Sequence, residues 1–137
     1  MEERINDKLT EIEEAITDLE NLEIPEFEEY IKNKMLMACC ERYFERIIEG
    51  VISLAFLIIR HKKLNSPESE EQAFFILAKN NIISETLAKK LKEAKDMRNI
   101  IVHNYEIADY SIVYHAITEE ILIDAEEFLN KIKLVLV

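Results

Sequence analysis

The chain has 137 residues, a length typical of a single domain. Hydrophobic residues make up 49% and charged residues 33%, a balance that suits a packed globular protein and excludes a disordered one. One Gly and two Pro in the whole sequence exclude a chain built from hairpins or glycine-rich phosphate loops. We therefore expect one all-α domain over residues 1–137.

The net charge of −11 is unevenly distributed along the chain. Residues 1–30 carry a net charge of −10 and residues 106–137 carry −5, whereas residues 31–105 carry +4. The acidity therefore belongs to the two ends, and the middle remains compatible with an RNA partner.

Nothing in the sequence suggests export or a membrane. The opening residues are acidic, unlike a signal peptide, and the most apolar run, residues 51–59, is far shorter than the roughly 20 residues of a membrane-spanning helix. Cys39 and Cys40 are adjacent, so they cannot easily form a disulfide with each other on a helix, and they indicate buried thiols in a reducing compartment. We expect a cytoplasmic protein that makes no membrane contact.

Two helices are predicted in the first half of the chain. The first carries an apolar stripe in three- and four-residue steps, made of Ile5, Leu9, Ile12, Ile16 and Leu19. Pro25 marks its end and a turn. A long second helix is expected over residues 26–61. Because residues 47–59 of that helix are apolar on most sides, the pattern predicts that a second copy of the chain covers it.

Three more helices are predicted after residue 61. Ser66 as the cap and Pro67 at the first helical position start the third helix, which extends to about Lys79. Asn80 and Asn81 form a turn, and the fourth helix begins at Ser84. A last helix starts near Tyr110 and faces inward through Val113, Ile117, Ile121, Ala125, Phe128 and Ile132. The expected fold is an up-and-down bundle of about five helices.

Several kinds of active site are absent from the sequence. There is no glycine-rich phosphate loop, no zinc spacing of Cys and His, and no Gly-x-Ser-x-Gly segment. A di-iron centre in a helical bundle requires Glu-x-x-His pairs, but an Ile lies three residues before each of His61, His103 and His115. We therefore expect neither a metal nor a cofactor. His61 suits a cation at a helix end, and His115 a structural residue.

The segment from Arg98 to Tyr105 is the best candidate for chemistry. On a continuous helix Arg98, Asn99, His103 and Tyr105 share one broad face, with Arg98 and His103 about 140° apart at the edges of a common concavity. Arginine offers a permanent cation to a phosphate, and histidine can give or take a proton near neutral pH. Those two functions suffice to cleave RNA without a metal.

Each of these residues also has a plainer interpretation. Arg98 and His103 fit a surface pair at a helix end, and Tyr105 fits a ring that packs with its hydroxyl bonded locally. Four lysines precede the motif and could guide an RNA backbone, or simply form a solvated face, because Glu93 and Asp96 lie among them. These lysines are Lys89, Lys90, Lys92 and Lys95.

The order Arg, four residues, His, one residue, Tyr resembles the signature of the HepT toxin family within the HEPN (higher eukaryote and prokaryote nucleotide-binding) superfamily. The similarity extends to Glu41-Arg42, the helix start at Pro67, the step over residues 81–84 and residues 106–114. It covers about residues 26–134, while residues 1–25 look more variable. Asn104 departs from the pattern, because many relatives have Gly there; we expect its side chain to point away from the polar face.

The resemblance implies a HEPN-like fold and a homodimer in which two motifs face each other across a shared cleft. It implies a metal-independent ribonuclease, an RNA endonuclease acting on tRNA or mRNA, with Arg98 and His103 catalytic and Asn99 supporting them. It also implies a partner, a minimal nucleotidyltransferase antitoxin that transfers AMP from ATP onto Tyr105. The added phosphate and nucleotide would then block RNA by charge and by bulk.

Two other functions remain open at this point. The chain could be a non-catalytic subunit that binds a nucleotide or substrate for a minimal nucleotidyltransferase, or a plain helical scaffold. The complete set of Arg98, His103 and Tyr105 disfavours both. Nucleotide affinity without RNA cleavage would indicate the binding subunit, and a motif that tolerates any substitution would indicate the scaffold.

Overall fold

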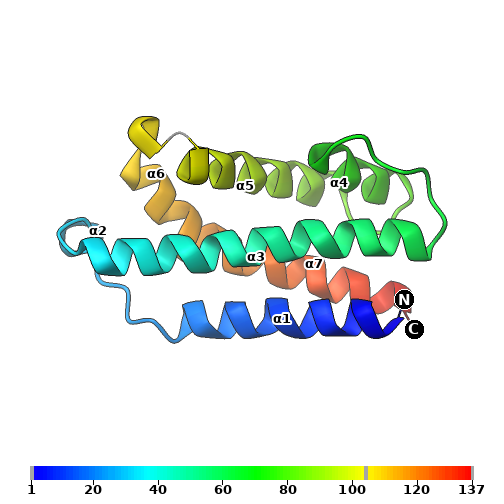
Figure 1. Ribbon diagram of the computed structural model, residues 1–137, viewed down its shortest axis with the longest axis horizontal. Coiled ribbons are helices and arrows are strands. Elements are labelled where there is room, and N and C mark those ends of the chain that lie inside the picture. Colours follow the sequence, from blue (N-terminus) through cyan, green and yellow to red (C-terminus); the bar gives the residue numbers. More distant parts are fainter. Residues whose placement is uncertain (1, 104, 137) are drawn as a thin grey trace.

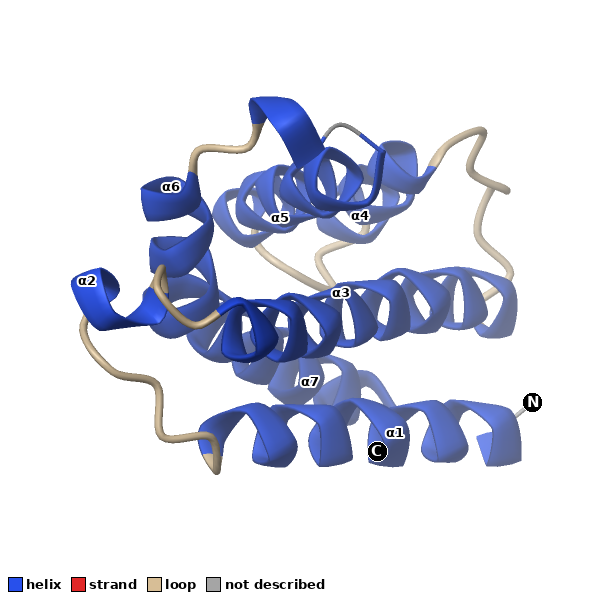
Figure 2. Cartoon of the chain, turned by 60° about the vertical axis from the view of Figure 1, so that its left-hand side comes forward, coloured by secondary structure: helices blue, strands red, loops and turns tan. Residues whose placement is uncertain are grey.

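The structure, a computed structural model, describes residues 2–103 and 105–136, so the expected orientation of Asn104 lies outside the described residues. Within those ranges the chain forms helices and loops without strands (Figure 2). The elements are α1 (Glu2–Glu20), α2 (Phe27–Tyr30), α3 (Lys34–His61), α4 (Glu70–Lys79), α5 (Glu85–His103), the 3-10 turn η1 (Tyr105–Ile107), α6 (Tyr110–His115), the π-helical turn η2 (Ala116–Glu120) and α7 (Ile121–Leu136). The predicted all-α bundle is confirmed. Its five main helical segments are α1, α3, α4, α5 and the continuous run from α6 to α7.

The long helix α3 is the centre of the bundle. It lies between α1 on one side and α4 and α5 on the other, and α7 crosses behind it (Figure 1). The apolar stretch of α3 is buried by these neighbours, with Ile47, Ile48, Val51, Leu54, Ala55 and Ile58 all fully inaccessible to solvent. The prediction that a second copy covers this stretch is therefore wrong, because the helices of the same chain already do so.

Helix α1 packs on α3 through the predicted stripe. Ile5, Leu9, Ile12, Ile16 and Leu19 are all buried, which confirms the pattern. The two helices approach each other closely at Gly50, where a Cβ atom would lie 2.7 Å from Cγ1 of Ile12. Real Cβ atoms do not come so near a neighbour, so the single glycine of the chain allows this contact.

The predicted second helix is interrupted near its beginning. Helix α2 ends at Tyr30 and α3 starts at Lys34, because Asn33 takes an extended conformation and its side chain accepts a hydrogen bond from the Leu36 amide at 3.0 Å. Asparagine commonly caps helix starts in this way. The break lets Tyr30 turn into the core, where 1% of its surface is exposed.

The start of α4 was also predicted wrongly. Ser69, not Ser66, caps the helix by accepting a hydrogen bond from the Gln72 amide at 3.1 Å, and Pro67 lies in the preceding loop. The shift of three residues places Glu70 in the first turn of α4. The predicted turn after this helix is confirmed, since Asn81 has a φ of 60° and the Ile82 amide bonds back to Leu77 at 2.9 Å.

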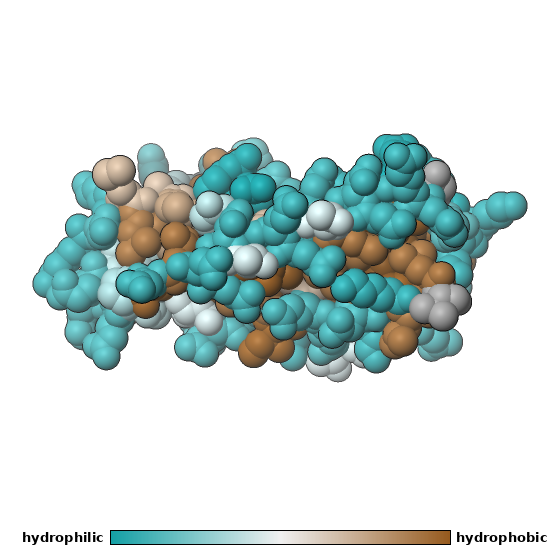
Figure 3. Space-filling view, turned by 90° about the horizontal axis from the view of Figure 1, so that it is seen from below, coloured by the Kyte–Doolittle hydropathy of each residue, from teal (hydrophilic) through white to brown (hydrophobic). Residues whose placement is uncertain are grey.

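The last helical segment begins where it was expected, at Tyr110, with Asp109 as its cap. All six residues predicted to face inward are buried, from Val113 to Ile132. Viewed from the α1 side, the surface is mostly polar, with groups of apolar atoms toward both ends of the molecule (Figure 3). Leu134 of α7 is 68% exposed. Among the helices of the described residues, none is long and apolar enough to cross a bilayer.

Candidate functional site

An open groove of about 550 Å³ lies between α3, α4 and the last turns of α5. Arg98, Asn99 and His103 all line it, so the structure brings the three polar residues of the motif helix to one surface. The remaining lining residues are Arg42, Glu45, Glu49, Glu70 and Val102. A phosphate bound to Arg98 in this groove would lie on the same surface as the imidazole of His103.

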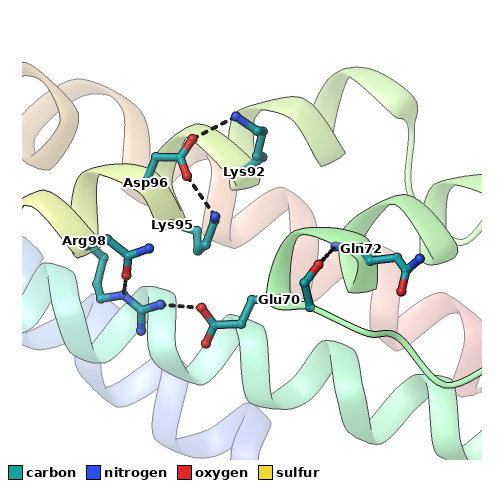
Figure 4. A network of polar contacts seen from close by, with 8 residues as sticks. Glu70, Gln72, Lys92, Lys95, Asp96 and Arg98 are labelled. Carbon is teal, nitrogen blue, oxygen red and sulfur yellow. Dashed lines mark hydrogen bonds and ion pairs between the residues drawn. The ribbon is translucent and has the colours of Figure 1, made fainter.

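Arg98 is held firmly at the wall of this groove. Its Nη2 donates to Oε1 of Glu70 at 2.6 Å, and its Nε donates to Oδ1 of Asn99 at 2.9 Å (Figure 4). The Arg98 side chain is only 13% exposed. Glu70 and Asn99 together accept from one edge of the guanidinium, and the remaining N–H groups can donate to a ligand. Asn99 therefore supports Arg98 directly, and Glu70 is a contact that the sequence analysis did not foresee.

The net charge of the groove differs in sign from the net charge of residues 31–105, which is +4. Arg42 donates to Glu45 at 3.1 Å and lies 4.0 Å from Glu49, so this second arginine is also paired. With His103 neutral, the two arginines and three glutamates of the groove give a net charge of −1. The excess of cations over residues 31–105 is thus not concentrated here. Binding an RNA phosphate must compete with these carboxylates.

None of the four predicted RNA-contacting lysines is among the residues that line the groove. Lys92 and Lys95 both bind Asp96, at 2.9 and 2.8 Å (Figure 4). Lys89 is exposed, and Lys90 lies at a separate pocket on the other side of α5. Their contact with an RNA backbone stays a prediction, and it would have to involve RNA outside the groove.

Tyr105 does not occupy the position that the helical projection assigned to it. Helix α5 ends at His103, and Tyr105 begins the 3-10 turn η1. Its hydroxyl donates to Oε2 of Glu41 on α3 at 3.3 Å, and its ring lies 5.8 Å from the Tyr110 ring. Burial, and then the charge of Glu41, raise the pKa of the Tyr105 hydroxyl to about 12. The projection failed here because it continued the helix past its end.

Glu41 is the second site residue that the sequence analysis did not assign a function. The residue is 7% exposed, and burial is the main cause that raises the pKa of its carboxyl group. A signal was available in the sequence: Glu41 occupies an inward position of the helical pattern, four residues after Met37 and next to Cys40 and Phe44, which are buried. Acids are rarely buried at such positions, which makes Glu41 a candidate for a functional residue.

Comparison with known proteins gives the family. The family model for ribonuclease HepT-like proteins matches residues 12–132. The chain belongs to this family. Family membership makes the protein an RNA nuclease, which agrees with the function expected from the Arg98 to Tyr105 motif.

Two characterised relatives are nucleases. The chain is 37% identical to the mRNA nuclease HepT of Shewanella oneidensis over 89 residues, which cover 65% of this chain and 66% of the relative. It is 25% identical to the tRNA nuclease HepT of Aphanizomenon flos-aquae over 114 residues, 83% of this chain and 78% of the relative. The chain thus spans about two thirds of the first relative and more of the second.

The fold is also found in a solved toxin. A tri-AMPylated HEPN toxin of Shewanella oneidensis, in complex with its MNT antitoxin, superposes with a TM-score of 0.87 at 29% identity. The match covers 95% of this chain and 96% of the toxin. The HEPN-like fold implied by the motif is therefore confirmed.

Proposed function

We propose that this protein is the toxin of a toxin–antitoxin pair, a cytoplasmic ribonuclease that cleaves RNA without a metal through Arg98 and His103. The observation that carries the proposal is that both side chains line one open groove in a chain of the ribonuclease HepT-like family. In the reaction a neutral imidazole removes the proton of a ribose 2′-hydroxyl, and the oxygen attacks the adjacent phosphorus. The bond to O5′ breaks as an imidazolium protonates that oxygen. Arg98 stabilises the charge that develops on the phosphate.

A homodimer would supply the second imidazole. His103 is the single imidazole among the residues that line the groove, and one ring cannot be protonated and neutral at the same time. Large apolar side chains are exposed around the end of the motif, where a soluble protein usually has few. They are Val102, Tyr105, Ile107, Tyr110 and Ile112, each 40–73% exposed. These side chains support a second copy that covers this end and brings two motifs together.

The proposed partner is a minimal nucleotidyltransferase that transfers AMP onto Tyr105. The support is the solved HEPN toxin, which is tri-AMPylated and bound to an MNT antitoxin. In this chain Tyr105 is 40% exposed, so its ring can be approached from outside. Its hydroxyl is bonded to Glu41, the residue next to Arg42 of the groove, so an added phosphate would lie near the groove's rim.

The nuclease proposal is tested by incubating the purified protein with mRNA and with tRNA in excess EDTA. Cleavage that is lost in Arg98→Ala and His103→Ala supports it. His115→Ala is the matched control, because His115 is exposed but lines a different pocket. Full activity in both motif variants would contradict the assignment of the site. Nucleotide binding without cleavage of either RNA would indicate the non-catalytic binding subunit instead.

The homodimer is tested separately by analytical ultracentrifugation and nuclease activity. Ile107→Glu places a charge on a side chain that is 73% exposed near the motif, and it should yield monomers that do not cleave RNA. Ile123→Glu makes the same change on α7, where the side chain is 64% exposed, and should leave the dimer intact. A stable dimer in the Ile107 variant would place the interface elsewhere.

A further inference from the structure

Glu41 is a buried carboxylate, and no described residue forms an ion pair with it. Within the described residues, the hydroxyl of Tyr105, at 3.3 Å, is its one hydrogen-bonding partner, and no ion pair involves it. Burying a charged group without a cation destabilises a protein, so packing alone does not account for this residue. Its single polar contact is with the tyrosine proposed above as the acceptor of AMP.

We propose that Glu41 is the general base of Tyr105 AMPylation, an inference that rests on the modification proposed above. Oε2 of Glu41 accepts the proton of the Tyr105 hydroxyl as the phenolic oxygen attacks the α-phosphorus of ATP. The new bond joins that oxygen to the phosphorus, and the bond between the α-phosphorus and the bridging oxygen to the β-phosphate breaks. The products are Tyr105 carrying AMP, pyrophosphate and a protonated Glu41.

The chemistry needs such a base. A phenol whose pKa is about 12 is almost wholly protonated at neutral pH, and the neutral oxygen is a poor nucleophile. A positioned base typically accelerates a proton-coupled step by about 10²–10⁴-fold. Burial raises the pKa of Glu41, which makes it a stronger base than a glutamate in water.

The surroundings of Glu41 favour one route for the proton. Among the described residues, the hydroxyl of Tyr105 is the one group that donates a hydrogen bond to Glu41. The hydroxyl of Tyr30 is buried and has no partner among the described residues. Other ionisable groups that act on Tyr30, Glu41 or Tyr105 through their charge come from α3 and α6: Cys40, Glu45, Tyr110 and Tyr114.

The proposal is tested by the rate of AMP transfer to the full-length protein. The protein is mixed with a minimal nucleotidyltransferase antitoxin, ATP and Mg²⁺, and AMP-sized mass gains are followed by intact mass spectrometry. Glu41→Gln keeps the size and an acceptor oxygen but cannot hold the proton. We expect transfer to slow at least tenfold, with partial recovery in Glu41→Asp. Glu106→Gln, a change at an exposed carboxylate next to Tyr105, should react normally.

The pH profile separates a base from a positioning contact. Wild-type transfer should fall as the pH is lowered through the pKa of Glu41, and this acidic limb should be absent from Glu41→Gln. A reduction of less than tenfold, or an unchanged acidic limb, overturns the proposal. The wild-type profile alone remains informative if the variant does not fold, since a rate without an acidic limb also overturns it.

Failure of the modification itself gives a different result. If wild-type protein gains no AMP, or if Tyr105→Phe gains as much as wild type, then Tyr105 AMPylation is wrong irrespective of Glu41. If wild type is modified on Tyr105 and Glu41→Gln reacts at the same rate, only the assignment of Glu41 is wrong.

Discussion

The negative charge that Glu70 places beside Arg98 should weaken the binding of RNA to the groove. Glu70 holds the guanidinium at 2.6 Å and brings a negative charge to the position where the phosphate must approach. Glu70→Gln removes the charge but keeps an oxygen that can accept from Arg98. We expect the variant to bind RNA more tightly than wild type, because the groove changes from a net charge of −1 to zero.

The size of this effect follows from the geometry. A phosphate on the free edge of Arg98 would lie about 6 Å from the Glu70 carboxylate, and two unit charges at that distance in water repel by about 0.7 kcal/mol. Removing this repulsion should lower the Kd for RNA by about threefold. The effect should fade at about 0.5 M salt, because mobile ions screen the two charges. The lost ion pair should cost the fold no more than about 1 kcal/mol, since Glu70 is 42% exposed.

The assay is a titration of the catalytically inactive His103→Ala protein with labelled RNA at low and high salt, with and without Glu70→Gln. Glu68→Gln is the matched control, because it makes the same charge change two residues away, outside the groove. Equal Kd values for the Glu70 variant and the control would show that the carboxylate does not oppose the phosphate. Weaker binding in the Glu70 variant would refute the reasoning, since it would mean that Glu70 is needed to orient Arg98.

Three further predictions concern stability, and thermal unfolding tests each. Gly50→Ala should destabilise the protein by about 1–2 kcal/mol, because the new Cβ would lie 2.7 Å from Ile12 Cγ1 and overpacking outweighs the gain in helix propensity; an unchanged Tm would contradict the close contact. Ser69→Ala should cost about 1 kcal/mol and Ser66→Ala almost nothing, since Ser69 caps α4; the reverse order would restore the cap predicted from sequence. Burial raises the pKa of Asp124, so its ionisation destabilises the folded state at neutral pH and this cost disappears as the pH falls through the raised pKa. Asp124→Asn should therefore raise the Tm at pH 7 and lose this advantage in acid; an advantage that is independent of pH would contradict it.

The sequence predicted most of the fold because apolar periodicity records which face of a helix is buried. The stripes of α1 and of α7 are buried as expected, and the turn at Asn81 lies where predicted. The helix ends were less certain, because several residues near each end can act as caps. Asn33 and Ser69 were missed for this reason, and which serine caps α4 depends on how the preceding loop packs.

The positions of the candidate site residues were predictable where those residues share one helix. Arg98, Asn99 and His103 lie on α5, so their positions follow from helical geometry. The contacts made by Glu70 and Glu41 join residues 28 and 64 positions apart in the sequence, and no local pattern specifies them. The same limit explains the error about the apolar part of α3. A helix covered by its own chain and one covered by a second copy have the same sequence pattern.

Helix α3 contributes a residue to both parts of the proposed mechanism, the modification of Tyr105 and the binding of RNA in the groove. Glu41 contacts Tyr105 and Arg42 lines the groove, and consecutive residues on a helix point about 100° apart. The Glu41–Tyr105 contact and the groove therefore lie on adjacent sides of one rigid helix. If Tyr105 carries AMP as proposed, the negative phosphate would lie beside the groove and would oppose the binding of an RNA phosphate at Arg98. Inhibition by modification then requires no change of fold, because the nucleotide would block the phosphate site by its charge and its size.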